Sequence, residues 1–382
     1  MAYTMTTHSD DVDELLKKCV QCGSCILICP IYRATGDETF SPRGKLYYLK
    51  LKEAFPDKFD DELAKDYAKT IFTCAVCSRC VENCTSEVKL TDIFREERKA
   101  SVGLFPNLLQ IGENIEDEMN VYGLDNEMRA ETWTMELYDD FPDIDDRVYE
   151  EGMTADTILF VGCLMSFRSR HSNVLKSILK VMEHFDEDYL ILGGEEYCCG
   201  HPLDLLGKIE EADELRKHNT EIIHKTKAKT VITDCPGCLE ALIDHHKLDD
   251  SVRVLHVTEY FDEKVDTVPN PLNIKLKYHD PCELFRNSEV TTAPRSILKK
   301  MGVEVIEMEP SCCGGGGMLR VTADNVAQEI MDQRIEKEKL KEEDTCVITC
   351  CPSCLEQFEQ KGITTGDIAE YLVKALNLEE EK

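Results

Sequence analysis

Hydrophobic and polar positions change their pattern at about residue 154. From there onward, short apolar runs bounded by turn residues alternate with longer amphipathic segments. Short apolar runs are typical of buried strands, and amphipathic segments are typical of helices. The alternation predicts an α/β fold, because helices connect the neighbouring strands of a parallel sheet.

The predicted elements form two similar series. In the first, strands and helices alternate at 156–163, 172–185, 189–194, 207–227 and 229–235. In the second, they alternate at 276–282, 294–302, 303–309, 325–343 and 345–351. We therefore expect two repeated, Rossmann-like α/β lobes over residues 154–268 and 269–382.

The sequence itself supports the repeat. Residues 231–240 and 347–356 agree in eight of ten positions, and each stretch has a cysteine directly after an apolar strand. Loops at the C-terminal ends of parallel strands are where α/β folds bind ligands. Four cysteines have this position: Cys163, Cys235, Cys282 and Cys351.

The chain before residue 154 follows a different pattern. Residues 1–100 carry two cysteine runs on either side of a charged, helical stretch at 45–69. Residues 101–153 contain no cysteine and are rich in acidic residues. We expect a helical domain at 1–100, followed by a connecting helix and an exposed acidic linker at 101–153.

Charge and hydropathy exclude two classes of protein. The formal net charge is −31, with 75 acidic and 44 basic residues, whereas nucleic-acid binding needs a basic surface. The longest apolar run, 158–165, is far shorter than the roughly 18 residues that span a bilayer. We expect no nucleic-acid partner and no transmembrane segment, so any membrane association would come through a partner.

The chain has 20 cysteines, and 18 of them fall into four motifs. Disulfide-rich scaffolds are small and secreted, whereas this chain has 382 residues and groups its cysteines in C-x-x-C clusters. Metal ligation accounts better for this grouping, and it indicates a reducing, cytoplasmic location.

The first two motifs have the ligand spacing of bacterial two-cluster ferredoxins. In that spacing, three closely spaced thiolates bind one cubane cluster and the fourth cysteine binds the other. We expect two cubane [4Fe-4S] clusters, and the alternative is a pair of zinc sites. One cluster would be held by Cys19, Cys22, Cys25 and Cys84, and the other by Cys74, Cys77, Cys80 and Cys29.

The last two motifs each offer five thiolates, one more than a cubane cluster needs. Each has the form Cys…Cys-Cys-Gly…Cys-Pro-x-Cys, and the two occur at matched positions of the repeat. The odd number of ligands indicates a cluster of unusual shape. A redox-active dithiol and a zinc site are the alternatives.

This motif resembles the cysteine-rich CCG domain of heterodisulfide reductases. A helical ferredoxin domain followed by two CCG lobes resembles the D subunit of these enzymes from methanogenic archaea. The resemblance implies two non-cubane [4Fe-4S] clusters. Their ligands would be Cys163, Cys198, Cys199, Cys235 and Cys238 in the first lobe, and Cys282, Cys312, Cys313, Cys351 and Cys354 in the second.

The second motif departs slightly from the family spacing. The interval from Cys282 to Cys312 is short, and the interval from Cys313 to Cys351 is long by about one residue. Cys350 therefore remains an alternative ligand to Cys351. Cys346 has no predicted role.

The resemblance implies reduction of the disulfide between coenzyme M and coenzyme B. Two clusters that face one substrate would each supply one electron, and Cys199 and Cys313 are expected to be essential. His201 and His279 would donate protons to the departing thiolates, or would support the clusters by hydrogen bonds. Arginines are candidates to bind the anionic coenzymes, although each has a plain surface role as its alternative: Arg168, Arg170, Arg286 and Arg320.

The electron donor is not determined by the motifs. A membrane cytochrome b is implied by similarity to the D subunit, and a soluble flavoprotein, hydrogenase or formate dehydrogenase is equally compatible. The main competing function is an iron–sulfur electron-transfer subunit of a glycolate, lactate or glycerol-3-phosphate dehydrogenase. A zinc-bound scaffold or redox sensor is the third interpretation.

Overall fold

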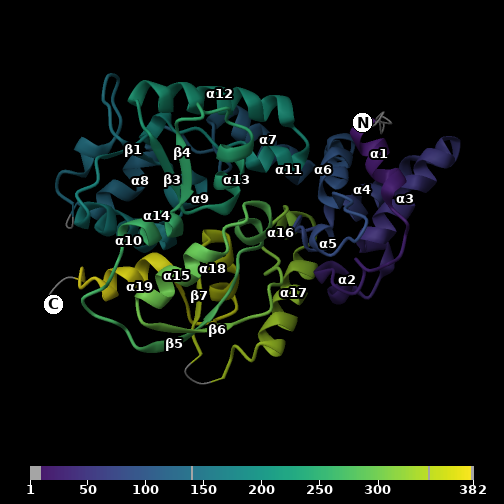
Figure 1. Ribbon diagram of the computed structural model, residues 1–382. Helices are drawn as coiled ribbons and strands as arrows, with labels where there is room; N and C mark the ends of the chain where they lie inside the picture. The colour runs from purple at the N-terminus through teal and green to yellow at the C-terminus, as the bar shows by residue number, and fades with distance from the viewer. Residues whose placement is uncertain (1–9, 139–140, 343–344, 380–382) are drawn as a thin grey trace. The chain divides into compact units, whose positions relative to one another are not determined.

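Each of the two repeated lobes contains a four-stranded parallel sheet, as the computed structural model shows (Figure 1). The structure describes residues 10–138, 141–342 and 345–379. Parts of the predicted ranges at 1–9, 139–140, 343–344 and 380–382 lie outside the described residues. The predicted α/β class with two parallel sheets is confirmed.

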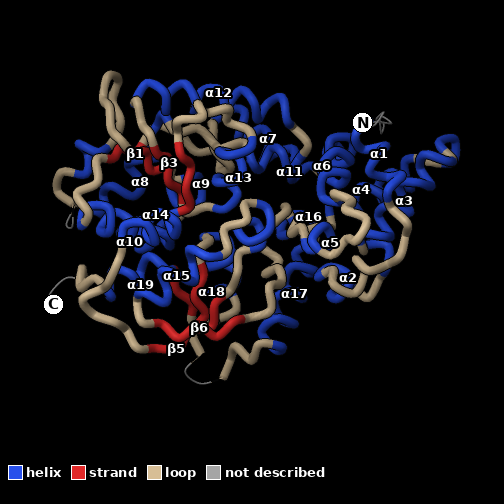
Figure 2. The backbone as a smooth tube through the Cα atoms, in the orientation of Figure 1, coloured by secondary structure: helices blue, strands red, loops and turns tan. Residues whose placement is uncertain are grey.

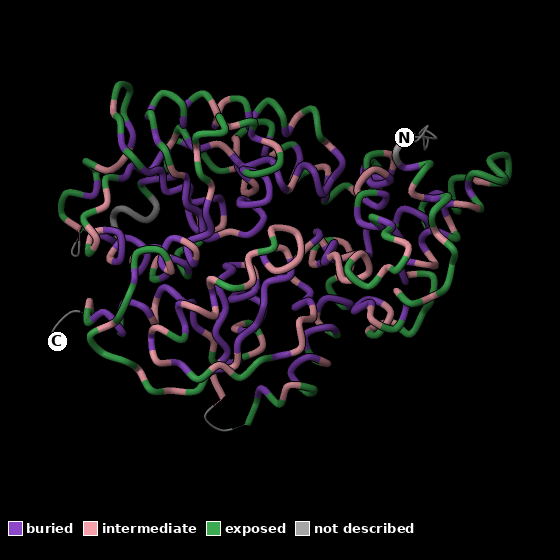
Figure 3. Tube along the Cα trace, in the orientation of Figure 1, coloured by how far each residue is buried: buried purple, intermediate pink, exposed green. Residues whose placement is uncertain are grey.

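The first sheet has the strand order β2-β1-β3-β4. Its strands are β1 (Thr157–Leu159), β2 (Tyr189–Ile191), β3 (Thr230–Thr233) and β4 (Arg253–His256). In the parallel register, Leu159 of the central strand β1 pairs with Ile191 on one side and with Ile232 on the other. Strands β1 and β2 are buried along their whole length, which explains their continuous apolar runs (Figure 3).

The second sheet repeats this topology in the order β6-β5-β7-β8. Its strands are β5 (Ile274–Tyr278), β6 (Val303–Glu307), β7 (Val347–Thr349) and β8 (Thr365–Asp367). Tyr278 of β5 pairs with Glu307 on one side and with Ile348 on the other. The repeat in the sequence is therefore also a repeat of strand order.

The fourth strand of each sheet, β4 or β8, was not predicted. Both lie at a sheet edge, and β8 has the sequence Thr-Gly-Asp, which offers no apolar run. Each strand leads directly into a helix that begins with a capping box, at His256 with Glu259 and at Asp367 with Glu370. Short edge strands of this kind escape detection because their hydrophobic signal is weak.

Helices of the two lobes pack against each other. The helix α10 (Ser172–His184) contacts α19 (Ile368–Ala375), and α14 (Val257–Lys264) contacts α15 (Thr292–Lys300). One apolar core accordingly contains residues of both lobes. The other long helices of the lobes are α12 (Ile209–Thr226), α13 (Pro236–Asp244), α17 (Asp324–Lys337) and α18 (Pro352–Gln360).

The N-terminal part consists of helices joined by loops (Figure 2). They are α1 (Asp10–Lys18), α2 (Pro30–Thr35), α3 (Pro42–Ala54), α4 (Asp61–Phe72), α5 (Arg79–Glu82) and α6 (Leu90–Ser101). A small apolar core that includes Leu46, Tyr67 and Ile93 holds them together. The loops between these helices carry most of the cysteines of the first two motifs.

The segment predicted as an exposed linker is more ordered than expected. It contains α7 (Pro106–Glu118), α8 (Met128–Leu137) and the 3-10 turn η4 (Ile144–Arg147). Val148 forms a parallel bridge with Ile191 of β2, and Leu137 and Ile144 are buried in the core of the lobes. This segment therefore contributes to the fold of the first lobe.

Contacts divide the chain into two compact units. The first unit comprises residues 1–112, 202–209 and 311–339, and the second comprises 113–201, 210–310 and 340–382. Each lobe thus contributes a segment to the unit that contains the N-terminal helices. Within the described part of the chain, every helix is too short or too polar to cross a membrane.

Candidate metal centres

Two cavities in the first unit are lined by the cysteines of the first two motifs. One is lined by Cys19, Cys22, Cys25 and Cys84. The other is lined by Cys29, Cys74, Cys77 and Cys80. Each cavity takes three cysteines from one run and the fourth from the other run, which is the grouping expected from the ferredoxin spacing.

The sequence Ser41-Pro-Arg-Gly-Lys45 places one basic side chain at each of these cavities. The Ser41 hydroxyl accepts a hydrogen bond from the Gly44 N–H (3.0 Å) and so caps α3. Arg43 lines the first cavity, and Lys45 lines the second. Lys45 is 1% exposed. Burial lowers the pKa of Lys45, while the charges of Cys74 and Cys29 oppose this effect.

The five cysteines of the third motif lie together in the second unit. Cys163 follows β1 in the short helix α9 (Gly162–Phe167), Cys198 and Cys199 precede α11 (His201–Leu206), and Cys235 and Cys238 begin α13. Their thiols form one hydrogen-bonded chain in the order Cys163, Cys198, Cys199, Cys238 and Cys235. The first lobe therefore assembles all five predicted ligands.

The backbone around this site is tightly packed. Gly162 has φ +77°, and a Cβ atom there would lie 3.1 Å from the Cys238 Sγ. Hydrogen bonds with Cys198 and Cys238 lower the pKa of the Cys199 thiol to about 6. A hydrogen bond with Cys238 also lowers the pKa of Cys235. Hydrogen bonds within the same chain of thiols raise the pKa values of Cys163 and Cys238. The thiolate is the metal-ligating form, so a bound metal would displace the protons that these thiols share.

The cysteines of the fourth motif are divided between the two units. In the second unit, Cys282 precedes the π-helical turn η7 (Glu283–Asn287), and Cys351 and Cys354 begin α18. A hydrogen bond with Cys354 lowers the pKa of Cys351, but burial and the charge of Cys235 raise it overall. The cysteines at the start of α13 and of α18 are thus electrostatic neighbours.

In the first unit, backbone amides point at the sulfurs of the adjacent cysteine pair. The Gly314 N–H donates to the Cys312 Sγ (3.3 Å), and the Gly315 N–H donates to the Cys313 Sγ (3.4 Å). Amide hydrogen bonds to sulfur stabilise thiolate ligands of iron–sulfur clusters. This donor geometry fits a cluster better than a pair of inert thiols.

The glycines after Cys313 permit a close approach to a ferredoxin-type run. Gly317 has φ +65°, and a Cβ atom there would lie 2.5 Å from the carbonyl oxygen of Cys74. The Thr322 hydroxyl also donates to the Phe72 carbonyl (3.1 Å). Within the first unit, the segment after the Cys-Cys pair therefore packs directly on the segment that carries the second cysteine run.

The two remaining cysteines have different surroundings. Cys350 is fully buried among apolar core residues, and its Sγ lies 3.6 Å from the Tyr278 hydroxyl. Cys346 is partly buried, and its Sγ lies 3.1 Å from the Tyr371 hydroxyl. Cys351, by contrast, shares the start of α18 with Cys354, which favours it over Cys350 as the ligand.

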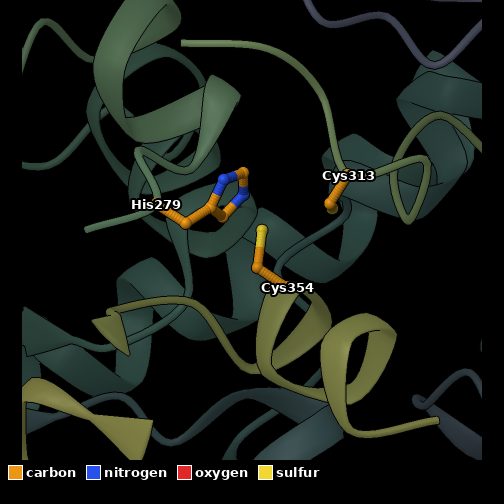
Figure 4. A group of neighbouring side chains, drawn as sticks. All are labelled: His279, Cys313 and Cys354. Atoms are coloured by element: carbon orange, nitrogen blue, oxygen red, sulfur yellow. The ribbon is translucent and has the colours of Figure 1, made fainter. Parts of the chain in front are cut away.

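The predicted histidines are both buried beside cysteines. The Nε2 of His201 lies 3.4 Å from the Glu283 carboxylate, and a Cβ atom at Gly237, between Cys235 and Cys238, would lie 2.8 Å from the His201 ring. His279 is fully buried at the end of β5, with a ring nitrogen within 4.8 Å of the Cys354 Sγ (Figure 4). Figure 4 also labels Cys313, which belongs to the first unit.

The structure places the four candidate arginines in different surroundings. Arg168 donates to the Tyr122 hydroxyl (3.0 Å), and Arg286 donates to the Pro310 carbonyl (2.5 Å). Arg170 forms an ion pair with Glu359. Arg320 lies half-buried in α16 (Leu319–Thr322). Anion binding by these arginines stays a prediction.

Sequence reasoning missed two buried charged residues beside the third motif. They are Arg129 in α8 and Glu196 before the Cys-Cys pair, and they form an ion pair (2.9 Å). Arg129 lies in the segment that was predicted to be an exposed linker. Only its tertiary contacts identify it as part of the site.

Known protein families match three stretches of the chain. A family described as the 4Fe-4S dicluster domain matches residues 15–88, and the family described as the cysteine-rich domain (CCG) matches residues 157–243 and 276–359. The chain is 28% identical to the D subunit of the dihydromethanophenazine:CoB–CoM heterodisulfide reductase of Methanosarcina barkeri, over 95% of this chain and 94% of the relative.

Other relatives take part in different reductions. The chain is 26% identical to the B subunit of the fumarate reductase (CoM/CoB) of Methanothermobacter marburgensis, over 92% of this chain and 70% of the relative. It is also 26% identical to the EtfAB:quinone oxidoreductase of Syntrophomonas wolfei, over 94% of this chain and 58% of the relative.

These findings define the chain as an iron–sulfur oxidoreductase in which a dicluster ferredoxin domain is fused to two cysteine-rich domains. Within this class, it is similar over 95% of its length to heterodisulfide reductase D subunits, as the resemblance in its cysteine motifs indicated.

Proposed function

We propose that this protein is a catalytic subunit that reduces the disulfide of coenzyme M and coenzyme B to two thiols. The observation that carries the proposal is the pair of five-cysteine motifs at matched positions of the two lobes, with Cys235 and Cys351 as electrostatic neighbours. A chain that only relayed electrons would not need two such sets. The relative named for this activity matches nearly the whole chain.

The proposed cofactors are two cubane and two non-cubane [4Fe-4S] clusters, which supply electrons one at a time when bound. The cubane clusters would be held by the cysteines of the two cavities in the first unit. The non-cubane clusters would be held by the two five-cysteine sets, with Cys351 rather than Cys350 in the second set.

Protons for the two product thiols are assigned to the buried histidines. His201 lies beside Cys235 with its Nε2 at 3.4 Å from the Glu283 carboxylate, and His279 lies beside Cys354. Cleavage of the disulfide consumes two electrons and two protons and yields two thiols. A histidine close to each cysteine set is suited to deliver one proton to each sulfur.

Electrons would come from a separate donor protein. A membrane cytochrome b, a soluble flavoprotein, a hydrogenase and a formate dehydrogenase are the candidate partners. A cytoplasmic location, with membrane association through that partner, remains part of the proposal.

The test is oxidation of a reduced viologen dye by the anaerobically purified chain, with the coenzyme M–coenzyme B disulfide as substrate. The dye replaces the unknown donor. We expect rapid oxidation with the mixed disulfide and slow oxidation with the symmetrical disulfide of either coenzyme. A chain that has its full iron content but does not oxidise the dye would contradict the proposal.

The second candidate is an electron-transfer subunit. Similarity over 94% of the chain to the EtfAB:quinone oxidoreductase favours it. A relay protein would pass electrons from viologen to a quinone analogue and would leave the disulfide intact. The same assay with a quinone analogue as the acceptor therefore separates the two functions.

A further inference from the structure

A buried arginine from outside the matched domains donates to a cysteine of the first lobe. The Arg129 side chain is 2% exposed, and its NH2 nitrogen lies 3.5 Å from the Cys163 Sγ. Its other terminal nitrogen donates to Glu196 (2.9 Å) and to the Ser166 hydroxyl (3.1 Å). These three contacts fix the plane of the guanidinium group against the sulfur.

Glu196 and Ser166 also hold the turn that carries Cys163. The two carboxylate oxygens of Glu196 accept hydrogen bonds from the N–H groups of Val161 and Gly162, at 2.8 Å each. The Ser166 hydroxyl donates to the Gly162 carbonyl (2.8 Å). The arginine is therefore tied to the backbone on which the thiol depends for its position.

Arg129 carries a positive charge in this buried site, because the guanidinium group is not deprotonated in proteins. A charge in a buried site of low dielectric acts more strongly on its neighbours than a charge in water. Hydrogen bonds to cluster sulfurs and nearby charge are among the factors that set the reduction potential of iron–sulfur centres.

We propose that Arg129 is a positioning residue that orients the Cys163 thiolate and raises the reduction potential of the cluster bound there. The inference rests on the proposed function, because it takes Cys163 as a cluster ligand. A fixed positive charge stabilises the reduced cluster, which carries one more negative charge than the oxidised cluster. The cluster of the first lobe is thereby made a better electron acceptor.

A second arginine lies close to the start of the fourth motif. Arg295 donates to the carboxylates of Asp280, two residues before Cys282, and of Glu307. Its side chain is 30% exposed.

The experiment is a redox titration of the anaerobically purified full chain, followed by electron paramagnetic resonance, with iron measured in every variant. The signal that is lost in a Cys163→Ser variant marks the first site. In Arg129→Met, we expect the midpoint potential of this signal to fall. At a fixed potential, the ratio of reduced to oxidised cluster should decrease at least tenfold, which corresponds to a shift of about 59 mV for one electron.

The charge-conserving variant Arg129→Lys should keep its iron, and its midpoint potential should stay close to that of the unaltered protein. The control is Arg147→Met, because Arg147 pairs with Glu183 (3.1 Å) at the edge of the same lobe. This control variant should leave the midpoint potential of every signal unchanged.

Three outcomes decide the inference. An unchanged midpoint in Arg129→Met, with full iron, would overturn it. If Arg129→Met loses the iron of the first site, Arg129→Lys decides: retained iron supports the role of the charge, and an equal loss overturns it. If Cys163→Ser loses none of the signals that the unaltered protein shows, the proposed function is contradicted instead.

Discussion

The imidazole Nε2 of His201 lies 3.4 Å from a carboxylate oxygen of Glu283. His201 follows the Cys-Cys-Gly sequence of the third cysteine motif, and Glu283 follows the first cysteine of the fourth. The two residues therefore join the cysteine segments of the two lobes within the second unit. We expect this contact to make His201 the better placed of the two candidate proton donors, because a nearby carboxylate favours the protonated imidazole.

Replacement of His201 by Asn should slow disulfide reduction with the viologen dye by about 100-fold, at the lower end of the usual contribution of a general acid. The iron content should not change. The control is His218→Asn, because His218 stacks on Tyr197 at a more exposed position of the same lobe. Equal activity of the two variants would remove His201 from the proposed chemistry.

Replacement of Cys199 or Cys313 by Ser should abolish disulfide reduction, with a loss of at least about 100-fold, since even residues that only support metal ligands cost up to this factor. The cubane signals should persist, because the cavities of the first two motifs use other cysteines. Cys346→Ser is the matched control and should retain activity. Full activity in Cys199→Ser or Cys313→Ser would contradict the proposed roles of these two cysteines in disulfide reduction.

Iron content should distinguish Cys350 from Cys351. Cys351→Ser should lose the iron of one cluster, because Cys351 lies beside Cys354 at the start of α18. Cys350→Ser should keep all iron, because Cys350 is packed among apolar residues. The opposite pattern would transfer the ligand role to Cys350.

Gly317→Ala should slow electron transfer from the dye to the disulfide by about tenfold or more, because the added Cβ would collide with the Cys74 carbonyl at 2.5 Å and push the two segments apart. Gly362→Ala is the matched control, because Gly362 has a similar φ of +71° but open space around it. Stopped-flow reduction of the clusters measures the effect. Similar rates in both variants would show that backbone strain, rather than the contact with Cys74, is responsible.

Stability should fall as the pH drops from about 6.5 to about 4, in part through His246. Burial lowers the pKa of His246 to about 4, and its ring nitrogens lie within hydrogen-bond distance of the Ala241 carbonyl (2.9 Å) and the Asn219 side chain (3.4 Å). Between these two pH values, the unfolded chain binds a proton that the folded chain excludes, so acid favours unfolding. Chemical denaturation at several pH values checks this.

His246→Gln should flatten this dependence on pH, and His184→Gln, at an exposed position on α10, should not. An unchanged slope in His246→Gln would mean that His246 does not contribute.

The sequence by itself determined the class of the fold and the grouping of the first two cysteine motifs around two cavities. Apolar runs fix strands that are buried on both faces, and thiol spacing along a chain limits which sulfurs can reach one centre. The repeat was equally visible, since 231–240 and 347–356 are nearly the same sequence. The edge strands β4 and β8 were not visible, because they lack a continuous apolar run.

Only the tertiary structure decided what surrounds the sulfurs. Arg129 stands in an acidic segment without any motif, and its role depends on a contact with Cys163, 34 residues further along the chain. The approach of Gly317 to Cys74 likewise joins segments far apart in the sequence. A local pattern records the neighbours of a residue along the chain, whereas the charge and the packing around a thiol depend on which distant segments fold against it.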